Sequence, residues 1–407
     1  MKISIIIFLC FFSTTFLSKA EEKDSLLLNR YGNLLNEIRK EFAPDKRTDL
    51  FNLTLVDGAL EVETTREDAL VKFRSVIKEQ NVGGAVVVEK LLPGKDLGEK
   101  VFGIVRLSVS NHRQNPAHSS EMVTQSLLGT PVQLLKKERG YYLVRTPDRY
   151  ISWLSADELS LLTTSEMQQW KKADRVVFIP EYGHSFAEAS GQSLPVSDLV
   201  SGNILEVIGK HRKFSKVKYP DGRVAWISNK ELMPLDKWLS RPVPGGEDVL
   251  KTAYKFLGVP YLWGGTSTKG MDCSGFTKTC YFLNGIQLSR DASQQALYGE
   301  NIDIFDKDSL SLEKCLANLQ AGDLLFFAAG RAENKNARVT HTAIYIGEGE
   351  FIHAAGLVRI NSIKKDASNY ADFQSRTIVG ARRILKSVST PGIRWIGRDE
   401  LYRTASH

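Results

Sequence analysis

A glycine-rich turn that leads into a cysteine constrains this chain more than any other feature. The stretch Tyr261–Phe276 reads YLWGGTSTKGMDCSGF, and the glycines before its cysteine permit backbone angles that other residues resist. Asp272 stands where a helix N-cap is expected, so Cys273 falls in the first turn of the helix. The positive end of a helix dipole favours the thiolate, which is the reactive form of cysteine. Taken alone, the stretch predicts either a nucleophilic thiol or a buried, inert cysteine.

The N-terminus has the pattern of a secretory signal. Lys2 precedes an apolar run over residues 3–17, and residues 18–20 (SKA) place small side chains where a signal peptidase reads. We therefore expect cleavage after Ala20, export to the periplasm or the cell exterior, and no integral membrane segment afterwards. An uncleaved anchor is the alternative, although the run is short for a membrane span. Lipidation at Cys10 is a further alternative, but the small residue usual beside a lipidated cysteine is missing.

Length and charge set the broad class. The 407 residues exceed one ordinary core, so two to four domains are expected. The formal charge of +7 falls to +5 without residues 1–20, since that segment holds two lysines and no acid. A solvated surface explains this mild excess, and no nucleic-acid partner is expected.

The first part of the mature chain reads as a small α/β domain over residues 21–100. Apolar spacing predicts a helix over residues 24–42, strands over 51–56 and 59–62 around Asp57-Gly58, a helix over 67–80 and a strand over 85–88. Nothing in this region points to chemistry.

An internal repeat follows. When the chain is shifted by 73 residues, Gly129–Leu159 falls on Gly202–Leu232 without a gap, and Trp153 meets Trp226. Each copy reads as strand, polar turn, strand, Pro-Asp turn and a strand that holds the tryptophan. This spacing predicts two small β-barrels, one over residues 101–165 and one over 166–240. For the paired tryptophans we expect core packing rather than ligand binding.

The last large domain is expected over residues 245–390, followed by a tail over 391–407 without clear organisation. Three cysteines remain after processing, an odd number that leaves at least one free thiol. We interpret Cys280 and Cys315 as core residues, and a bridge between them stays open.

Two histidines complete a candidate catalytic set with the cysteine. His341 and His353 stand on two predicted strands around Gly347-Glu348-Gly349. A three-residue loop would place both rings on one face, and a two-residue loop would place them on opposite faces. In the first case His341 acts as the base for Cys273, and His353 orients it. Zinc is the competing chemistry, but no C-x-x-C or H-x-x-x-H spacing supports it, so no metal or other cofactor is expected.

These segments resemble known families. Tyr150–Leu154 and Val224–Ile227 are similar to the tryptophan strand of bacterial SH3-type (SH3b) barrels. The later motifs resemble, in order, those of the NlpC/P60 cysteine peptidases: Tyr261-Leu-Trp-Gly-Gly, Asp272-Cys-Ser-Gly-Phe276, Gly322-Asp-Leu, His341-Thr-Ala-Ile-Tyr-Ile-Gly347 and Phe351-Ile-His-Ala354. The fold class expected is multidomain α+β, with a papain-like catalytic domain behind two SH3-like barrels and the N-terminal α/β domain.

The resemblance also implies an activity. It implies Cys273 as nucleophile, His341 as base and His353 as orienting residue, in hydrolysis of the γ-D-glutamyl–diamino acid bond of peptidoglycan peptides. Two barrels before such a domain resemble a narrower group of these enzymes, which cuts short fragments with a free N-terminal L-alanine. We expect the protein to be a monomer. By that analogy the substrate is bound by the residues Tyr261, Asp272, Ser274, Asp291 and Glu121.

Other interpretations stay open at this point. Asp272 equally fits a helix cap, and Asp291 equally fits a surface turn. Tyr261 or the backbone N–H of Cys273 is expected to stabilise the oxyanion. For the whole protein, the alternatives are an amidase or endopeptidase that acts on intact peptidoglycan, and a non-catalytic protein that binds the wall.

Overall fold

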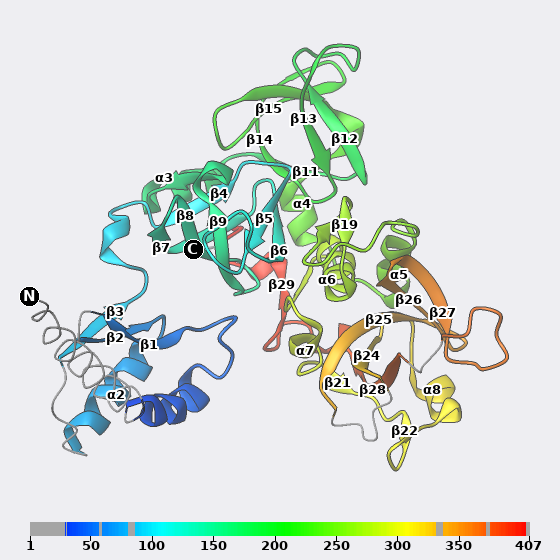
Figure 1. The fold of residues 1–407 in the computed structure, drawn as a ribbon. Helices are drawn as coiled ribbons and strands as arrows, with labels where there is room; N and C mark the ends of the chain where they lie inside the picture. The colour runs from blue at the N-terminus through cyan, green and yellow to red at the C-terminus, as the bar shows by residue number, and fades with distance from the viewer. Residues whose placement is uncertain are drawn as a thin grey trace, which may run out of the picture. The chain divides into compact units, whose positions relative to one another are not determined.

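The computed structural model describes residues 29, 31–56, 59–79, 86–330, 337–371 and 375–403. The chain divides into two compact units, Met1–Leu97 and Gly98–His407 (Figure 1). The predicted signal segment and the Asp57-Gly58 turn lie outside the described residues. Within that described part, no helix has both the length and the apolar character needed to cross a bilayer.

The first unit contains helices and a three-stranded sheet. Residues 31–42 are helical, and the further elements are β1 (Phe51–Val56), β2 (Ala59–Thr64), α2 (Glu67–Glu79), β3 (Val87–Leu91) and the 3-10 turn η1 (Lys95–Leu97). β1 and β2 are antiparallel, and Val56 pairs with Ala59, which leaves a two-residue connection as the sequence predicts. β3 runs parallel to β2. One apolar core joins the helices and the sheet, with Phe51 edge-on to Phe73.

A seven-stranded antiparallel sheet opens the second unit. Its elements are β4 (Phe102–Val105), β5 (Val109–Arg113), β6 (Met122–Leu127), β7 (Pro131–Glu138), β8 (Tyr141–Arg145), β9 (Ile151–Ser155), η2 (Ala156–Glu158) and β10 (Leu159–Leu162). The strand order is β10-β4-β7-β8-β9-β5-β6. Helix α3 (Thr164–Lys172) follows and begins with a capping box between Thr163 and Glu166.

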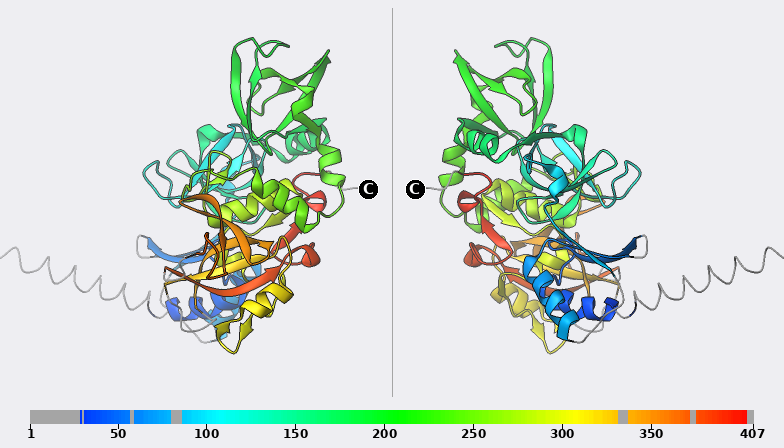
Figure 2. Two further views of the ribbon diagram at one scale, coloured as in Figure 1. Left: turned by 90° about the vertical axis from the view of Figure 1, so that its right-hand side faces the viewer. Right: turned by 90° about the vertical axis from the view of Figure 1, so that its left-hand side faces the viewer.

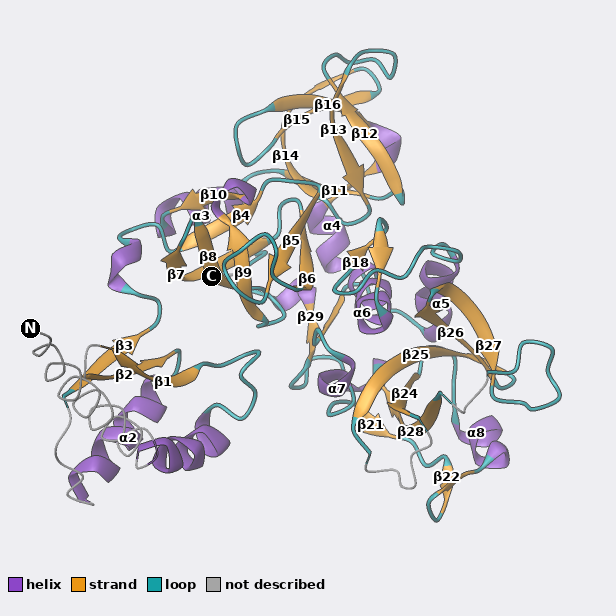
Figure 3. Ribbon diagram, viewed as in Figure 1, coloured by secondary structure: helices purple, strands orange, loops and turns teal. Residues whose placement is uncertain are grey.

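The next sheet repeats the first strand for strand. Its elements are β11 (Arg175–Phe178), β12 (Tyr182–Phe186), β13 (Pro195–Val200), β14 (Ile204–His211), β15 (Phe214–Lys218), β16 (Val224–Ser228), η3 (Asn229–Glu231) and β17 (Leu232–Pro234). Read from β17, its order matches that of the first sheet (Figure 3). Each of these strands begins 73 residues after its counterpart, including three that the sequence comparison did not cover. Trp153 is buried, as core packing requires, whereas Trp226 is half-buried.

The rest of the chain contains helices and a six-stranded sheet (Figure 2). The helices are α4 (Leu235–Ser240), α5 (Gly246–Tyr254), α6 (Cys273–Leu283), α7 (Ala292–Gln295) and α8 (Leu312–Asn318). The sheet has the order β21-β28-β24-β25-β26-β27. Its strands are β21 (Glu300–Asn301), β24 (Leu324–Ala329), β25 (Val339–Gly347), β26 (Glu350–Ala355), β27 (Leu357–Ser362) and β28 (Arg376–Arg383). Short pairs flank it: β18 (Thr266–Ser267) with β19 (Gly270–Met271), and β22 (Phe305–Asp306) with β23 (Ser309–Leu310).

Alternate residues of this sheet feed two separate cores. Phe326 and Ile344 pack with Phe276 of α6 and with residues of α5. Phe327 and Ala343 face the other way and pack with residues of α8. The period of two along each strand therefore places helices on both faces of the sheet.

The two cysteines that the sequence assigned to the core are free and buried, so the bridge left open between them is not formed. Cys280 belongs to the core that contains α6, and Cys315 belongs to the core that contains α8.

The C-terminal tail is organised, although its sequence gave no clear pattern. β29 (Ile393–Trp395) pairs with β20 (Ile286–Leu288), the strand that follows α6. The 3-10 turn η4 (Leu385–Ser387) precedes this strand and the 3-10 turn η5 (Ile396–Arg398) follows it. Tyr402 is buried in a cluster with Trp238 of α4. The tail therefore belongs to the packed part of the second unit.

Candidate active site

Helix α6 begins at Cys273, as the sequence predicts. The carboxylate of Asp272 caps the helix by accepting a 2.7 Å hydrogen bond from the N–H of Gly275. Gly275 has to be glycine, because a Cβ there would lie 1.9 Å from the carbonyl oxygen of Gly265. The glycine turn and the start of the helix thus fit together with no room for a side chain between them.

The carboxylate of Asp272 is fully engaged by protein groups. It accepts from the N–H of Gly264 at 2.9 Å, and it forms an ion pair with both terminal nitrogens of Arg290, at 2.5 and 3.1 Å. Arg290 also donates to the hydroxyl of Ser274 at 3.0 Å. Burial works to lower the pKa of Arg290, but the charge and hydrogen bonds of Asp272 outweigh it and raise that pKa. The structure therefore gives Asp272 a capping and ion-pairing role, and its predicted contact with substrate stays a prediction.

The Cys273 thiol is buried and protonated in this resting structure. Burial raises the pKa of the Cys273 thiol to about 11, and the negative charge of Asp272 adds to this effect. Backbone N–H groups of Thr342 and Ser274 act in the opposite direction by hydrogen-bonding the thiolate, but they do not prevail. The expectation that the helix terminus alone would favour the thiolate is therefore wrong for the resting enzyme, because desolvation is the larger effect. The contact with Thr342 places the sulfur against β25, one residue from His341.

The hairpin that carries the two histidines reaches the expected arrangement by a different route. Gly347 pairs with Glu350, so the loop has two residues, not the three that the sequence favoured. A bulge between Tyr345 and Gly347 then shifts the register by one residue, and Ile344 pairs with Ile352. Continued along the strands, this register places His341 and His353 on one face. The bulge, not a longer loop, restores their alignment.

A chain of hydrogen bonds fixes which nitrogen of each ring carries the proton. The amide nitrogen of Asn361 donates to the backbone oxygen of Asn369 at 2.9 Å, so its Oδ1 faces Nε2 of His353, also at 2.9 Å. Nε2 of His353 must then carry hydrogen, and its Nδ1 accepts. That Nδ1 lies 2.8 Å from Nε2 of His341, which is therefore the donor. The remaining nitrogen of His341, Nδ1, is left unprotonated and able to act as a base.

The surroundings keep both rings neutral. Burial lowers the pKa of His341 well below 6.5, and the positive charges of His353, Arg376 and Arg359 lower it further. Burial also lowers the pKa of His353 to about 4, although its hydrogen bond to Asn361 opposes this. Among the described residues no hydrogen bond joins the Cys273 thiol to His341, and contacts of this kind are often long before substrate binds and tighten afterwards.

The pH dependence of the free enzyme follows from these shifts. Because the pKa of Cys273 is raised to about 11, we expect alkylation by iodoacetamide to accelerate throughout pH 7 to 10 instead of levelling off near neutrality. Because the pKa of His341 is lowered, the base stays neutral below pH 6.5, and the acid limb of kcat/KM should lie below that value. A plateau of alkylation rate already at pH 7 would show a resting thiolate and contradict the first part.

Tyr261 lies close to the thiol. Burial raises the pKa of Tyr261, and the neighbouring charges of Cys273 and Asp272 raise it further, so the phenol keeps its proton. Its backbone N–H donates to Gly356, which ties the turn to the end of β26. A protonated hydroxyl beside the sulfur can donate a hydrogen bond to a developing oxyanion.

The first seven-stranded sheet (β4 to β10) and its loops reach the glycine turn. Glu121 accepts a 2.7 Å hydrogen bond from the indole N–H of Trp263, an exposed side chain in the turn. The side chain of Gln125 accepts from the backbone N–H of Thr266 at 2.9 Å. Gly264 has a φ of +78°, and a Cβ there would lie 2.5 Å from the oxygen of Met122. The first seven-stranded sheet and its loops thus form one wall beside the candidate site.

Asp291 sits at the start of the short helix α7 and is half-buried. Its backbone N–H donates to the side chain of Gln294 at 3.1 Å, which is the reciprocal half of a capping box. This local geometry is a helix cap and not the surface turn given as the alternative, and the contact of Asp291 with substrate stays a prediction.

Three residues of the site were missed by sequence reasoning: Asn361, Arg290 and Arg376. The first orients His353, the second pairs with Asp272, and the third lies 3.3 Å from Nε2 of His341. Arg290 precedes a predicted site residue, which was the one local signal available. The other two stand on strands that follow the histidines, and no spacing links them to the site.

Replacing Asn361 should disturb catalysis without removing a reacting group. Asn361→Ala lets the His353 ring turn, so the proton of His341 is no longer held on Nε2. We expect kcat to fall about 10- to 100-fold with little change in KM, by analogy with partners that orient catalytic ligands. Asn361→Asp, which keeps the acceptor, should recover most of the rate. Equal losses in both variants would point to a packing role instead.

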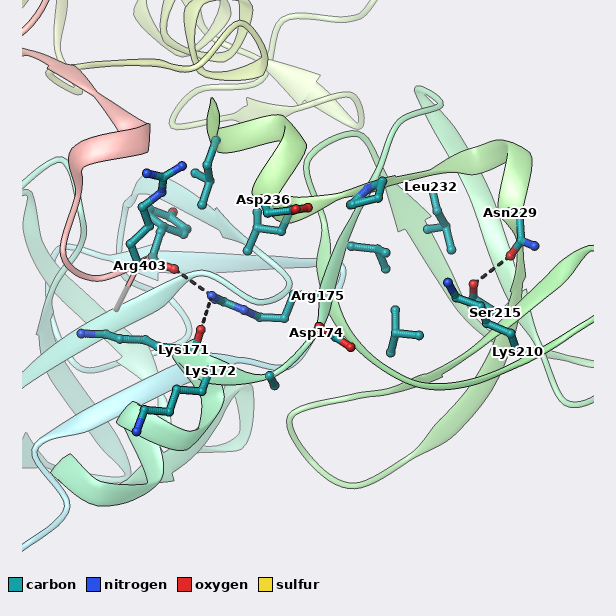
Figure 4. Close-up of a pocket in the computed structure, with 17 residues that line it drawn as sticks. Lys171, Lys172, Asp174, Arg175, Lys210, Ser215, Asn229, Leu232, Asp236 and Arg403 are labelled. Carbon is teal, nitrogen blue, oxygen red and sulfur yellow. Dashed lines mark hydrogen bonds between the residues drawn. The ribbon is translucent and has the colours of Figure 1, made fainter. Parts of the chain in front are cut away.

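A cavity of about 890 Å³ lies in another part of the molecule (Figure 4). It is lined by residues of α3, α4, the second barrel and the tail, and none of the candidate site residues lines it. Arg175 in its wall donates to the backbone oxygens of Lys171 and Tyr402. No group of His, Cys, Asp and Glu suited to a metal ion occurs in the part of the chain that the structure describes.

Comparison with known proteins agrees with this architecture. The model of the NlpC/P60 family matches residues 258–377, and the model of the bacterial dipeptidyl-peptidase SH3 domain matches residues 112–159. A γ-D-glutamyl-L-lysine dipeptidyl-peptidase of Bacillus cereus is 29% identical over 287 residues, which cover 66% of this chain and 77% of the relative. A probable endopeptidase of Haemophilus influenzae is 34% identical over 128 residues, which cover 31% of this chain and 70% of the relative.

A solved structure shows the same fold over most of its length. The crystal structure of an NlpC/P60 family protein from Bacillus cereus matches with a TM-score of 0.57 and 24% identity, covering 70% of this chain and 99% of that one. With a helix-borne cysteine beside a histidine-bearing sheet, the site is that of a cysteine peptidase. The chain belongs to the NlpC/P60 family.

Proposed function

We propose that this peptidase hydrolyses the γ-D-glutamyl–diamino acid bond of peptidoglycan stem peptides. The observation that carries the proposal is the chain of hydrogen bonds that joins His341, His353 and Asn361. It leaves Nδ1 of His341 unprotonated, and His341 is the neighbour of Thr342, whose backbone N–H contacts Cys273. The names of the relatives support the choice of bond, since two of them are γ-D-glutamyl-L-lysine dipeptidyl-peptidases.

The proposed reaction uses the three residues in order. Nδ1 of His341 takes the thiol proton while the sulfur of Cys273 bonds to the γ-carbonyl carbon, and the oxygen becomes an oxyanion. Tyr261 and the backbone N–H of Cys273 stabilise that charge. The C–N bond then breaks as His341 returns the proton to the leaving amine, which leaves a thioester. Water attacks the thioester, gives a proton to His341 and releases the γ-D-glutamyl acid and the thiol.

The substrate is proposed to be a short fragment with a free N-terminal L-alanine. The support is the position of the first seven-stranded sheet beside the glycine turn. There the carboxylate of Glu121 accepts a hydrogen bond from the indole N–H of Trp263. A carboxylate there suits an ammonium group, and a closed end excludes longer chains. Tyr261, Ser274 and Asp291 are proposed to line the rest of this pocket.

Two alternatives remain within hydrolysis: an amidase that cuts the sugar–peptide bond, and an endopeptidase that acts on intact wall. The non-catalytic interpretation loses its basis, because the chain is a member of a peptidase family with the cysteine and both histidines present. We further propose export after removal of residues 1–20, a monomer, and the division at residues 100, 165, 240 and 390 that the sequence predicts.

Product analysis by mass spectrometry tests the proposal. L-Ala-γ-D-Glu-diamino acid should yield L-Ala-D-Glu and the free diamino acid, and N-acetylation of the alanine should reduce the rate strongly. Equal cleavage of blocked and free peptides would overturn the closed pocket. Release of stem peptides from purified wall, with no cleavage of the free peptides, would favour the alternatives instead.

A further inference from the structure

A small cationic cavity lies beside the two histidine rings. It measures about 270 Å³, and its lining includes His341, His353, Asn361, Arg359 and Arg376. A water molecule in the liquid occupies about 30 Å³, so the cavity has room for a carboxylate with its flanking methylene groups. Its described lining contains two guanidinium groups and no carboxylate.

Among the residues that the structure describes, neither Arg359 nor Arg376 takes part in an ion pair. Arg376 is half-buried and points a terminal nitrogen at Nε2 of His341, at 3.3 Å. That ring nitrogen already donates its hydrogen to His353, and an arginine has only donors to offer. Arg376 therefore faces a position without a suitable acceptor, which is an arrangement that an anionic ligand would satisfy.

The reaction places the leaving amine at Nδ1 of His341, whereas Arg376 faces Nε2 at the other edge of the same ring. His341 has to protonate the leaving amine, so the diamino acid must lie against the His341 ring when the C–N bond breaks. The cavity shares that ring with the reacting centre. A side chain that extends from the leaving residue past His341 would meet Arg376 first and Arg359, which is exposed at the rim, next.

We infer that this cavity binds a carboxylate on the side chain of the leaving diamino acid, and that the enzyme therefore favours 2,6-diaminopimelate over lysine at this position. The inference rests on the proposed function, since it concerns the leaving group of that reaction. Diaminopimelate carries a second carboxylate where the lysine side chain ends in an ammonium alone. Two guanidinium groups attract the second carboxylate of diaminopimelate and repel the lone ammonium group of lysine.

The same contact would assist the chemistry. In the resting structure, the charges of Arg376 and Arg359 disfavour the imidazolium of both histidines. A bound carboxylate offsets that charge at the moment when His341 must hold two protons. The leaving group thus supplies the counter-charge that its own protonation needs, and the effect should appear in kcat as well as in KM.

Three peptides test the inference: L-Ala-γ-D-Glu followed by meso-diaminopimelate, by the same residue with its side-chain carboxylate amidated, and by L-lysine. The amidated peptide keeps the shape and removes the charge. A charge-assisted contact predicts a kcat/KM about 10- to 100-fold higher for the free carboxylate than for the amide or lysine peptide. In Arg376→Gln that ratio should fall towards one, and in Arg359→Gln it should fall in part.

The ratio within one variant is the readout, so a loss of folded protein does not imitate the effect. Arg382 is a matched control on the same strand, because its side chain donates to the oxygen of Ala296 and does not line the cavity. Arg382→Gln should keep the wild-type ratio. Equal kcat/KM of the wild type on the charged and amidated peptides overturns the inference alone. Cleavage of none of the three overturns the proposed function, and the inference with it.

Discussion

Cys273→Ala should abolish hydrolysis of L-Ala-γ-D-Glu-diamino acid peptides, with kcat/KM reduced at least about 10,000-fold. The sulfur is the atom that forms the bond to the carbonyl carbon, so no neighbouring group can take its place. The fold should survive, because the site of the change lies at the first residue of α6 and the Asp272 cap does not use the thiol. Steady-state kinetics, with a thermal melt of the variant, give the measurement.

Cys315→Ala is the matched control for that experiment. Cys315 is also a free, buried cysteine, but it belongs to the core on the α8 side of the sheet and takes no part in the proposed reaction. The variant should keep most of its activity, with a modest loss of stability from the smaller side chain. Substantial turnover by Cys273→Ala would remove the catalytic assignment, whatever the control shows.

His341→Gln should produce the second largest loss, about 1,000-fold in kcat. Glutamine can still accept or donate a hydrogen bond, but it cannot take the thiol proton or return it to the leaving amine. His184→Gln, a half-buried histidine of the second barrel, should leave the rate unchanged. A loss of less than about 10-fold in His341→Gln would show that another group acts as the base.

Alkylation separates the two roles of this histidine. If His341 acts only after substrate binds, the free enzyme of His341→Gln should react with iodoacetamide at a rate close to that of the wild type. A much slower reaction in the variant would show that His341 already activates the thiol in the resting state. The raised pKa of Cys273 argues for the first outcome.

The local parts of the site were predictable from the sequence. The cap at Asp272 and the start of α6 depend on neighbouring residues, which a chain displays in order. The repeat was visible for the same reason, and every strand of the second barrel begins at the expected distance from its counterpart. These features need no knowledge of distant contacts.

The hairpin shows where local reasoning stops. The pairing of His341 and His353 on one face was predicted, but the loop was not, because the bulge at Ile346 leaves no mark in the residue types. Turn length and bulge have compensating effects on register, so the same alignment arises in two ways. The face was correct, although the loop assumed for it was wrong.

Long-range contacts account for the rest. The pKa of Cys273 depends on how deeply packing buries the thiol, and burial overcame the helix terminus that the sequence emphasised. Asn361 and Arg376 come from β27 and from the start of β28, and only the folded sheet brings them to the histidines. The pairing of Arg290 with Asp272 likewise requires the tertiary structure.

The strand contributed by the tail has a consequence for how the protein withstands proteolysis. β29 pairs with β20, which ends at Leu288, two residues before Arg290. Arg290 forms the ion pair with Asp272, the N-cap residue of α6. Cleavage of the chain near Thr390 would free β29 from β20 and weaken the support of Arg290. The cleaved bond would lie more than a hundred residues from Cys273 along the chain. The β29 strand thus supports the segment that leads to Arg290, and we expect its removal to lower the activity of the enzyme.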